Sequence, residues 1–127
     1  MRLVPLGSGS TGNATLIELG GSAILVDAGL SARQLELRLD SVGVDPSSIA
    51  GIFLTHEHGD HARGAERFSK KNGVPVFCSV ETLKALDASP AHFASWEPLP
   101  DWGVDLGPLR IEPFDGQNWE ESVDQIR

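Results

Sequence analysis

The sequence is poor in cysteine and in long apolar runs, and each shortage excludes a class of protein. Its one cysteine, Cys78, cannot form an internal disulfide, so the chain is not a disulfide-rich secreted domain. No stretch approaches the roughly 18 consecutive apolar residues that a membrane span requires. Pro5 and Gly7 interrupt the apolar N-terminus, so no apolar secretory segment follows the one basic residue there. We therefore expect a cytoplasmic protein with no membrane association.

Basic residues are also scarce. The 127 residues include 10 Lys and Arg against 18 Asp and Glu, which gives a formal net charge of −8. Such a surface does not attract phosphate backbones over long distances, which argues against broad, non-specific nucleic-acid binding. It does not exclude a nuclease, because bound metal cations reverse the local field at a site. We interpret Arg67, Lys70 and Lys71, on one predicted helix, as a solvated basic face.

Length and composition fit one globular domain, because 40% of the residues are hydrophobic and no tract is of low complexity. Short apolar runs bounded by glycine, proline and acidic residues predict β-strands. The predicted strands are Leu3–Leu6, Ala14–Leu19, Ala23–Val26, Ile52–Leu54, Val74–Cys78 and Leu109–Phe114. Gly20-Gly21 is typical of a hairpin turn between the second and third strands.

Helices are predicted where apolar residues recur at helical spacing behind a capping residue. We expect a helix from Ser31 to just before Gly43, one turn after Asp45, and helices over Ala62–Lys71 and Val80–Leu86. Residues 89–108 hold four prolines and predict loop with one short strand. Strands come first and then alternate with helices, which predicts an α/β protein with a mixed sheet and helices on one face.

The segment Thr55–His61, T-H-E-H-G-D-H, carries the chemistry. His56 and His58 follow a buried strand, and side chains two apart in extended chain point the same way, so both imidazoles can bind one cation. Asp60 and His61 come next and can turn toward a second cation. Imidazole with carboxylate suits zinc first, with manganese or iron as alternatives. His92 stands alone and is not counted as a ligand.

Two close divalent cations favour hydrolysis. They share a bridging water, lower its pKa toward neutrality and polarise the scissile phosphoryl or carbonyl oxygen. Asp60 is the predicted catalytic residue, because it would both bind one metal and orient the hydroxide. Glu57 lies between two ligands, points the other way and is left out of the ligand set.

A dinucleotide-binding module is the main rival from another class. Gly7, Gly9 and Gly12 match G-x-G-x-x-G after a strand, and Asp27 follows 20 residues after Gly7. That fingerprint requires a helix directly after the loop. Only 11 residues separate Gly12 from Ile24, and they predict a strand, so we reject this reading.

The motif T-H-x-H-x-D-H, with Gly64 three residues beyond it, resembles the metallo-β-lactamase fold superfamily. Ile24–Gly29 resembles the superfamily's first motif, a strand that ends in Asp before a turn of small residues. The loop Ser8–Asn13 is similar to that of the YycJ/WalJ branch, whose members are metal-dependent hydrolases that act on nucleic acid. The resemblance covers about residues 2–114.

The resemblance implies roles for individual residues. The first metal would be bound by His56 and His58, and the second by Asp60 and His61. Asp27 would fix the metal loop by hydrogen bonds from behind the ligands. The predicted substrate side of the site is the N-terminal loop, with Ser10, Gly12 and Asn13.

The family pattern is incomplete here. A third histidine is expected after the strand that Arg110–Phe114 resembles, and none follows. The chain matches the N-terminal half of an αββα sandwich, with a partial domain at 1–115 and an unplaced acidic tail at 116–127. The inner sheet face would then be uncovered, which predicts a truncated member or a face covered by a second copy or another polypeptide.

These features predict a phosphodiesterase or nuclease, exonuclease-like, with nucleic acid as substrate. Two alternatives stay open. One is a non-catalytic metal-binding or interaction module, because the missing ligands affect catalysis more than fold. The other is a thioester hydrolase of the glyoxalase II kind, which shares the histidine motif. β-Lactam hydrolysis is disfavoured because such enzymes are usually exported.

Overall fold

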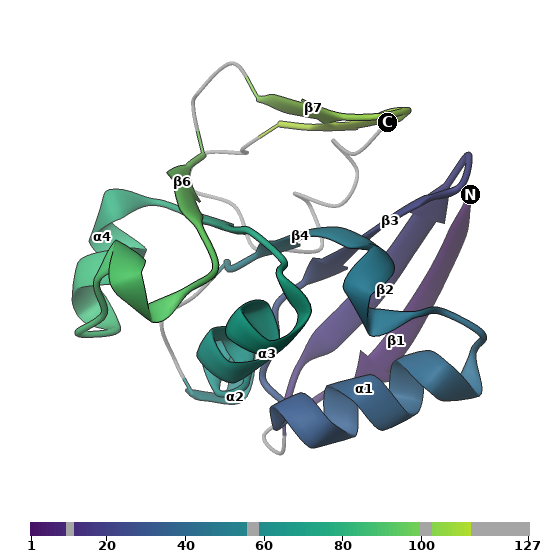
Figure 1. The fold of residues 1–127 in the computed structure, drawn as a ribbon, viewed down its shortest axis with the longest axis horizontal. Coiled ribbons are helices and arrows are strands. Elements are labelled where there is room, and N and C mark those ends of the chain that lie inside the picture. Colours follow the sequence, from purple (N-terminus) through teal and green to yellow (C-terminus); the bar gives the residue numbers. More distant parts are fainter. Residues whose placement is uncertain (10–11, 56–58, 100–102, 113–127) are drawn as a thin grey trace.

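A mixed six-stranded sheet organises the computed structural model, which describes residues 1–9, 12–55, 59–99 and 103–112 (Figure 1). The strands lie in the sheet in the order in which they occur in the chain. They are β1 (Arg2–Gly7), β2 (Ala14–Leu19), β3 (Ser22–Val26), β4 (Ile49–Phe53), β5 (Val76–Cys78) and β6 (Trp96–Pro98).

The direction of each strand follows from the length of the connection before it. β1, β2 and β3 pair antiparallel, and Gly20 and Gly21 close the second hairpin with φ of 57° and 84°, which glycine adopts without steric cost. From β3 onward the pairs are parallel. Parallel neighbours need a crossover, and helical segments supply each one.

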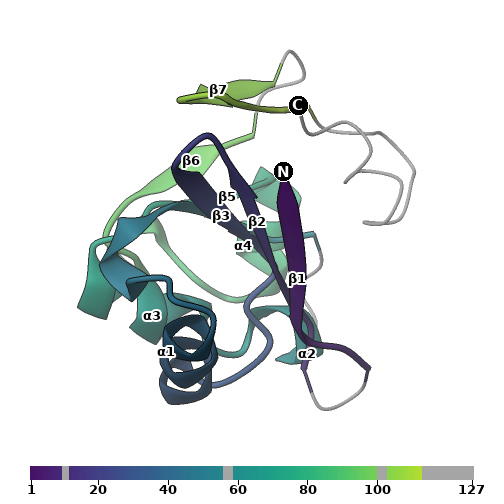
Figure 2. The ribbon, with the colours of Figure 1, turned by 90° about the vertical axis from the view of Figure 1, so that its right-hand side faces the viewer.

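The helical elements are α1 (Ala32–Ser41), η1 (Pro46–Ser48), α2 (Gly59–Ala62), α3 (Ala65–Asn72), α4 (Val80–Ala85) and η2 (Pro90–His92). Ser31 caps α1 as predicted, because its hydroxyl accepts a hydrogen bond from the Gln34 amide at 3.2 Å. Figure 2 shows α1 and α3 together on one side of the sheet. The predicted α/β fold with helices on one face is therefore confirmed. Within the described residues, no helix combines the length and the apolar character needed to cross a bilayer.

Apolar side chains cover both faces of the sheet, because successive residues of a strand point to opposite sides. Toward the helices, the strands contribute Leu16, Leu25, Ile52 and Val76. Toward the other side they contribute Ile17, Ile24, Val26, Phe53 and Phe77. The rings of Phe53 and Phe77 stack there with centroids 4.6 Å apart.

The expectation of a bare second face is wrong for this part of the sheet. Strands β7 (Val104–Leu106) and β8 (Leu109–Ile111) form a separate hairpin that contributes Leu109 and Ile111 to the same apolar cluster. The turn of the hairpin approaches the β2–β3 turn, since a Cβ on Gly20 would lie 3.0 Å from Pro108. The five strand residues named above for this face are at most 6% exposed, whereas Leu3 of β1, which pairs with Ile17, is 45% exposed. A second copy or another polypeptide over the rest of the face stays a prediction.

Three predicted segments also differ from the structure. Residues 89–108 contain η2, β6 and β7, where loop with one strand was expected. The predicted helix Ala62–Lys71 is two helices, α2 and α3, which meet near Gly64. The strand predicted over Leu109–Phe114 ends at Ile111 among the described residues. The predicted tail, 116–127, lies outside the described residues, so the division at 115 stays a prediction.

Candidate metal centre

The candidate site lies where two neighbouring parallel strands end. Val26 of β3 pairs with Phe53 of β4, so the residues that follow the two strands emerge side by side. Asp27 is the first residue after β3, and its amide donates to the Phe53 carbonyl at 2.8 Å. Thr55 follows β4 by two residues and opens the histidine segment. The sheet thus brings together two segments that are 28 residues apart in sequence.

Asp27 is the buried centre of this arrangement, with 2% of its surface exposed. Its carboxylate accepts hydrogen bonds from the Thr55 amide at 2.8 Å and from the Thr55 hydroxyl at 2.8 Å. The same carboxylate lies 2.7 Å from Nδ1 of His61. The backbone φ of Asp27 is 66°, in the left-handed region that Asp and Asn tolerate better than most residues. One side chain therefore holds both ends of the segment 55–61.

Burial and these contacts have opposite effects on the pKa of the Asp27 carboxyl group. Desolvation raises the pKa of Asp27, while hydrogen bonds from Thr55 and the nearby His61 lower it in part. With an ionised Asp27, Nδ1 of His61 carries the proton of the shared hydrogen bond. A metal would then be bound by Nε2, on the opposite edge of the ring, as in other carboxylate–histidine–metal arrangements. The orientation of His61 thus fits a metal ligand.

The backbone fixes the position of α2, which carries Asp60 and His61. The Ala28 amide donates to the His61 carbonyl at 2.7 Å, and the Gly64 amide donates to the Ala28 carbonyl at 2.7 Å. A Cβ on Gly64 would lie 2.0 Å from the Leu30 carbonyl oxygen, far inside contact distance. Only glycine fits there, which explains why the helix predicted over Ala62–Lys71 is interrupted at this point.

The N-terminal loop is tied to the same turn. The Asn13 side chain accepts from the Gly9 amide at 3.1 Å and donates to the Gly9 carbonyl at 3.0 Å. The Asn13 carbonyl accepts from the Gly29 amide at 2.9 Å. Gly12 has φ of 145°, and a Cβ there would lie 3.0 Å from the Gly29 carbonyl oxygen. Asn13 therefore closes its own loop, and a role toward substrate for this loop stays a prediction.

The structure describes only part of the predicted ligand set. His56 and His58 lie outside the described residues, as does Ser10 of the loop. Asp60 lies in α2, and His61 is placed against Asp27. Over the ranges that the structure describes, no group of three or more His, Cys, Asp or Glu side chains could hold a metal. The four-ligand assignment and the catalytic role of Asp60 therefore stay predictions.

Thr55 is a site residue to which the sequence reasoning gave no role. Its amide and hydroxyl both bond to Asp27, so it fixes the start of the histidine segment. Its position between a buried strand and the first histidine was the available signal. The rejection of a dinucleotide-binding loop agrees with the structure, because residues 14–19 are the strand β2 and not a helix.

Comparison with known proteins gives a consistent result. The family model of the metallo-beta-lactamase superfamily matches residues 7–126. Exodeoxyribonuclease WalJ of Streptococcus pneumoniae serotype 2 is 34% identical over 84 residues, which cover 66% of this chain and 31% of that protein. Exodeoxyribonuclease YycJ of Bacillus anthracis is 35% identical over 82 residues, which cover 65% of this chain and 31% of that protein.

A subclass B3 metallo-β-lactamase from a soil metagenome library is similar in structure. Its TM-score is 0.71 at 26% identity, over 87% of this chain and 48% of that one. The chain thus spans about a third of the length of the curated relatives and about half of the length of the solved structure. The family model matches nearly the whole chain, including the segments that carry Asp27 and His61. The chain therefore belongs to the metallo-β-lactamase superfamily.

Proposed function

We propose that the chain is part of a metal-dependent phosphodiesterase, a nuclease of the exonuclease type that acts on DNA. The observation that carries the proposal is the contact of 2.7 Å between Asp27 and His61 at the ends of two parallel strands. It fixes the Nδ1 edge of the His61 imidazole, and three further candidate ligands lie within five residues of His61 in the sequence. Curated relatives with 34–35% identity over this region are exodeoxyribonucleases by name, which supports the choice of substrate.

The ligands we propose are His56 and His58 for one divalent metal, and Asp60 and His61 for a second. Zinc is the first choice for imidazole and carboxylate ligands, with manganese or iron as alternatives. Metal bound there would lower the pKa of a water molecule and polarise the phosphoryl oxygen.

Each described residue has a definite task in this scheme. Asp27 holds the Nδ1 edge of His61, so Nε2 would be the nitrogen that binds the metal. Thr55 anchors the start of the ligand segment to the same carboxylate. We propose that Asp60 accepts the hydrogen bond that orients the attacking water toward phosphorus, and that the loop around Asn13 borders the substrate.

The nuclease names of the relatives favour phosphodiesters over thioesters. Ribonuclease TTHA0252 of Thermus thermophilus is a further relative, with 33% identity over 91 residues. A non-catalytic metal-binding module is the alternative that the experiment has to separate, because the chain spans about a third of the length of the two exodeoxyribonucleases. We also propose a cytoplasmic location, consistent with the single cysteine.

Metal content and nuclease activity test the proposal together. Inductively coupled plasma mass spectrometry on the purified chain is expected to find metal that His58→Ala and His61→Ala reduce. Lys84→Ala is the matched control, because Lys84 is exposed on α4 and contacts neither segment of the site. The metal-loaded chain should release nucleotides from end-labelled DNA, and the two histidine variants should not. Metal binding without release of nucleotides would favour the non-catalytic module.

A further inference from the structure

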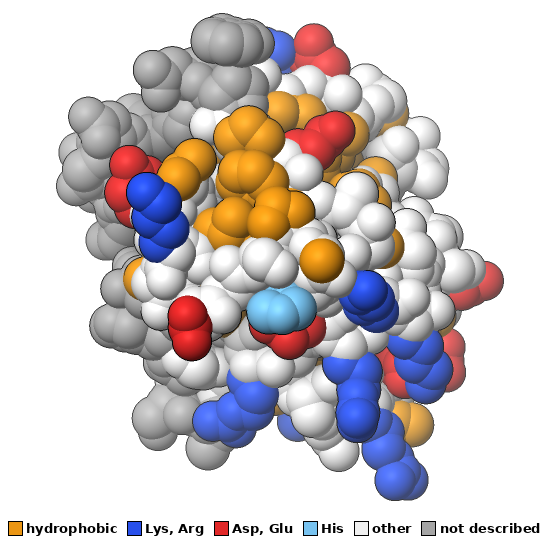
Figure 3. All heavy atoms as spheres, turned by 60° about the vertical axis from the view of Figure 1, so that its left-hand side comes forward, with side chains coloured by type: hydrophobic (Ala, Val, Ile, Leu, Met, Phe, Trp, Pro, Cys, Tyr) orange, Lys and Arg blue, Asp and Glu red, His pale blue; other side chains and the backbone are white. Residues whose placement is uncertain are grey.

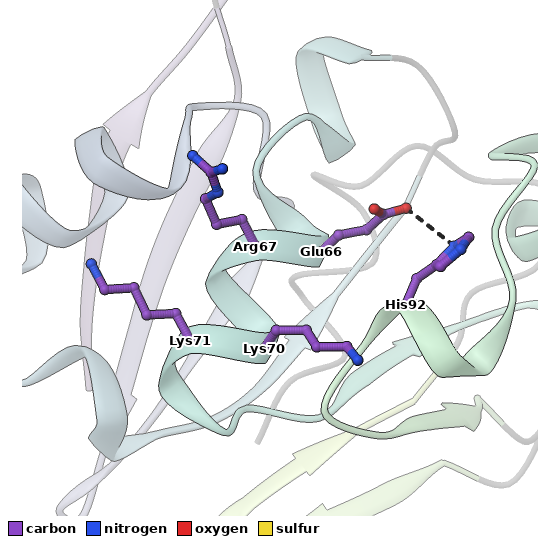
Figure 4. A pocket seen from close by; sticks show the side chains of 5 residues that line it. All are labelled: Glu66, Arg67, Lys70, Lys71 and His92. Carbon is purple, nitrogen blue, oxygen red and sulfur yellow. Dashed lines mark ion pairs between the residues drawn. The ribbon is translucent and has the colours of Figure 1, made fainter.

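A basic groove lies on the outer side of α3, apart from the ligand segment. It is lined by Glu66, Arg67, Lys70, Lys71 and His92 and has a volume of about 580 Å³ (Figure 4). The first four residues come from α3, and His92 comes from η2, about 20 residues later in the chain. Figure 3 shows a histidine with an acidic side chain beneath it and basic side chains gathered to one side of the pair.

Charge in this part of the chain is opposite to that of the whole. Residues 59–72, which form α2 and α3, contain four of the ten basic residues and only two of the eighteen acidic ones. The segment is therefore positive within a chain of net charge −8. An anionic ligand that approaches this protein meets attraction on this helix and repulsion over most of the remaining surface.

The positions of the basic side chains slightly destabilise helix α3. Arg67, Lys70 and Lys71 lie at positions i, i+3 and i+4, which are neighbours on a helix surface, and like charges at that spacing are mildly destabilising. Lys71 is offset by Glu36 of α1, to which it donates a hydrogen bond at 2.9 Å. Among the described residues, no carboxylate forms an ion pair with Arg67 or Lys70. These two are the cations that a bound anion would neutralise.

The opposite wall of the groove contributes a histidine. Nδ1 of His92 lies 3.6 Å from the Glu66 carboxylate, and both side chains remain about half exposed. In Figure 4, Lys70 and Glu66 extend toward the turn that carries His92, whereas Arg67 and Lys71 extend to the other side of the helix. The cations are therefore spread along α3 and suit an extended anion better than a single small one.

We propose that this groove binds the phosphate backbone of the nucleic-acid strand whose end is in the metal centre, an inference that rests on the proposed function. The segment that carries Asp60 and His61 continues directly through Gly64 into α3. Only the turn at Arg63 and Gly64 separates the two helices, so a strand whose end lies at His61 can continue along α3. The groove contacts phosphates away from the scissile bond and reads no base sequence.

Fluorescence anisotropy with a short labelled single-stranded oligodeoxynucleotide tests the groove separately from catalysis. Measured in EDTA, binding involves no metal and no cleavage. Each lost phosphate contact should weaken binding about fivefold at about 0.1 M salt, since each contributes about 0.7 to the salt slope of single-strand binding. Lys70→Gln should therefore bind about fivefold more weakly, whereas Lys84→Gln, the matched exposed lysine outside the groove, should bind like the unmodified chain.

Two further variants sharpen the test. Arg67→Gln/Lys70→Gln should reduce the salt slope by about 1.4, twice the effect of one contact. Glu66→Gln removes a negative charge from the groove and should tighten binding, a direction that damage to the fold would not produce. Circular dichroism on each variant checks that the helix is retained.

The outcomes separate the groove from the active site. Equal binding by Lys70→Gln and Lys84→Gln, or no binding by the chain at all, overturns the groove whether or not the chain cleaves DNA. Displacement of the oligonucleotide by polyglutamate at equal charge also overturns it and points to an acidic polypeptide instead. Loss of binding in Lys70→Gln with no cleavage by the metal-loaded chain would support the groove and refute the hydrolase.

Discussion

Replacement of Gly64 by alanine is expected to destabilise the fold more than any other single methyl group added near the site. The new Cβ would lie 2.0 Å from the Leu30 carbonyl oxygen and 3.1 Å from the Ala32 nitrogen, both rigid backbone atoms. The backbone angles of Gly64, φ −95° and ψ −1°, have a negative φ and lie in the region that residue i+2 of type I turns adopts, which alanine can also occupy. Any loss of stability therefore comes from the contact and not from backbone strain.

The expected loss of stability follows from the contacts that the added methyl group would disrupt. Overpacking of a filled site costs about 1–3 kcal/mol. Displacement of the turn also weakens the two hydrogen bonds that join Ala28 to His61 and Gly64, each with a net contribution of about 0.5–1.5 kcal/mol. We expect a decrease of about 2–4 kcal/mol in the free energy of unfolding, a large part of the 5–15 kcal/mol typical of a domain.

Urea unfolding of the metal-free chain, followed by circular dichroism, measures this decrease. The midpoint should fall by roughly 1–3 M with an unchanged m-value. Gly59→Ala is the control, because Gly59 begins the preceding helix α2 and a Cβ there meets nothing within 4 Å. If Gly64→Ala unfolds within about 0.5 kcal/mol of Gly59→Ala, the packing explanation of the α2–α3 break is refuted.

Three further substitutions or modifications test separate contacts. Asp27→Asn keeps the shape but not the charge beside His61, so metal affinity should fall about 10–100-fold in competition with a chromophoric chelator; unchanged affinity would contradict the positioning role. Burial raises the pKa of the Cys78 thiol, so the folded state prefers the protonated form. The contribution of the protonated thiol to the free energy of unfolding is present below the ordinary thiol pKa of about 8.5 and decreases as pH rises further. Alkylation of Cys78 by iodoacetamide near pH 9 should accordingly be slow until urea unfolds the chain, and equal rates would refute burial. Ser69→Ala removes the buried hydroxyl that accepts from the Ala94 amide at 3.0 Å and should cost about 1–3 kcal/mol in urea unfolding; a loss below about 0.5 kcal/mol would show that water replaces it.

Most elements of the fold could be predicted because their signals are local. The alternation in Ala14–Leu19, the two glycines after it and the Ser31 cap each act within a few residues, and each matches an element of the structure. The break at Gly64 has no local signal, because it arises from the approach of the Leu30 carbonyl, which is 34 residues away in sequence.

The candidate site likewise has parts that the local sequence predicts and parts that depend on tertiary contacts. The histidine segment is evident from composition and spacing, but the partner of His61 is not. Asp27 could be assigned only through resemblance to a family, since its contact with His61 depends on the pairing of β3 with β4. The basic face of α3 was evident from the spacing of Arg67 and Lys70. The position of His92 across a groove depends on how η2 packs against α3.

The hairpin β7–β8 shows why residues 89–108 were predicted poorly. Its first strand, β7, has three residues, too few for alternation to stand out among four prolines, whereas β8 lies within the strand predicted over Leu109–Phe114. They are stable because Leu109 and Ile111 pack against the second face of the sheet. A tertiary contact thus decides an element that intrinsic propensity leaves open.

The pairing of β3 with β4 makes the fold tolerant of insertions before β4 and intolerant of insertions directly after it. The ladder is irregular between Ala23 and Leu25 but regular where Val26 faces Phe53. An insertion before Ile49 falls in the connection between α1 and β4 and can lengthen that connection without moving the site. One residue added after Phe53 would carry Thr55 along by about 3.3 Å and turn it to the opposite side of the chain. Variation in loop length during evolution or engineering is therefore expected before β4, with the number of residues between the end of β4 and the histidine segment held fixed.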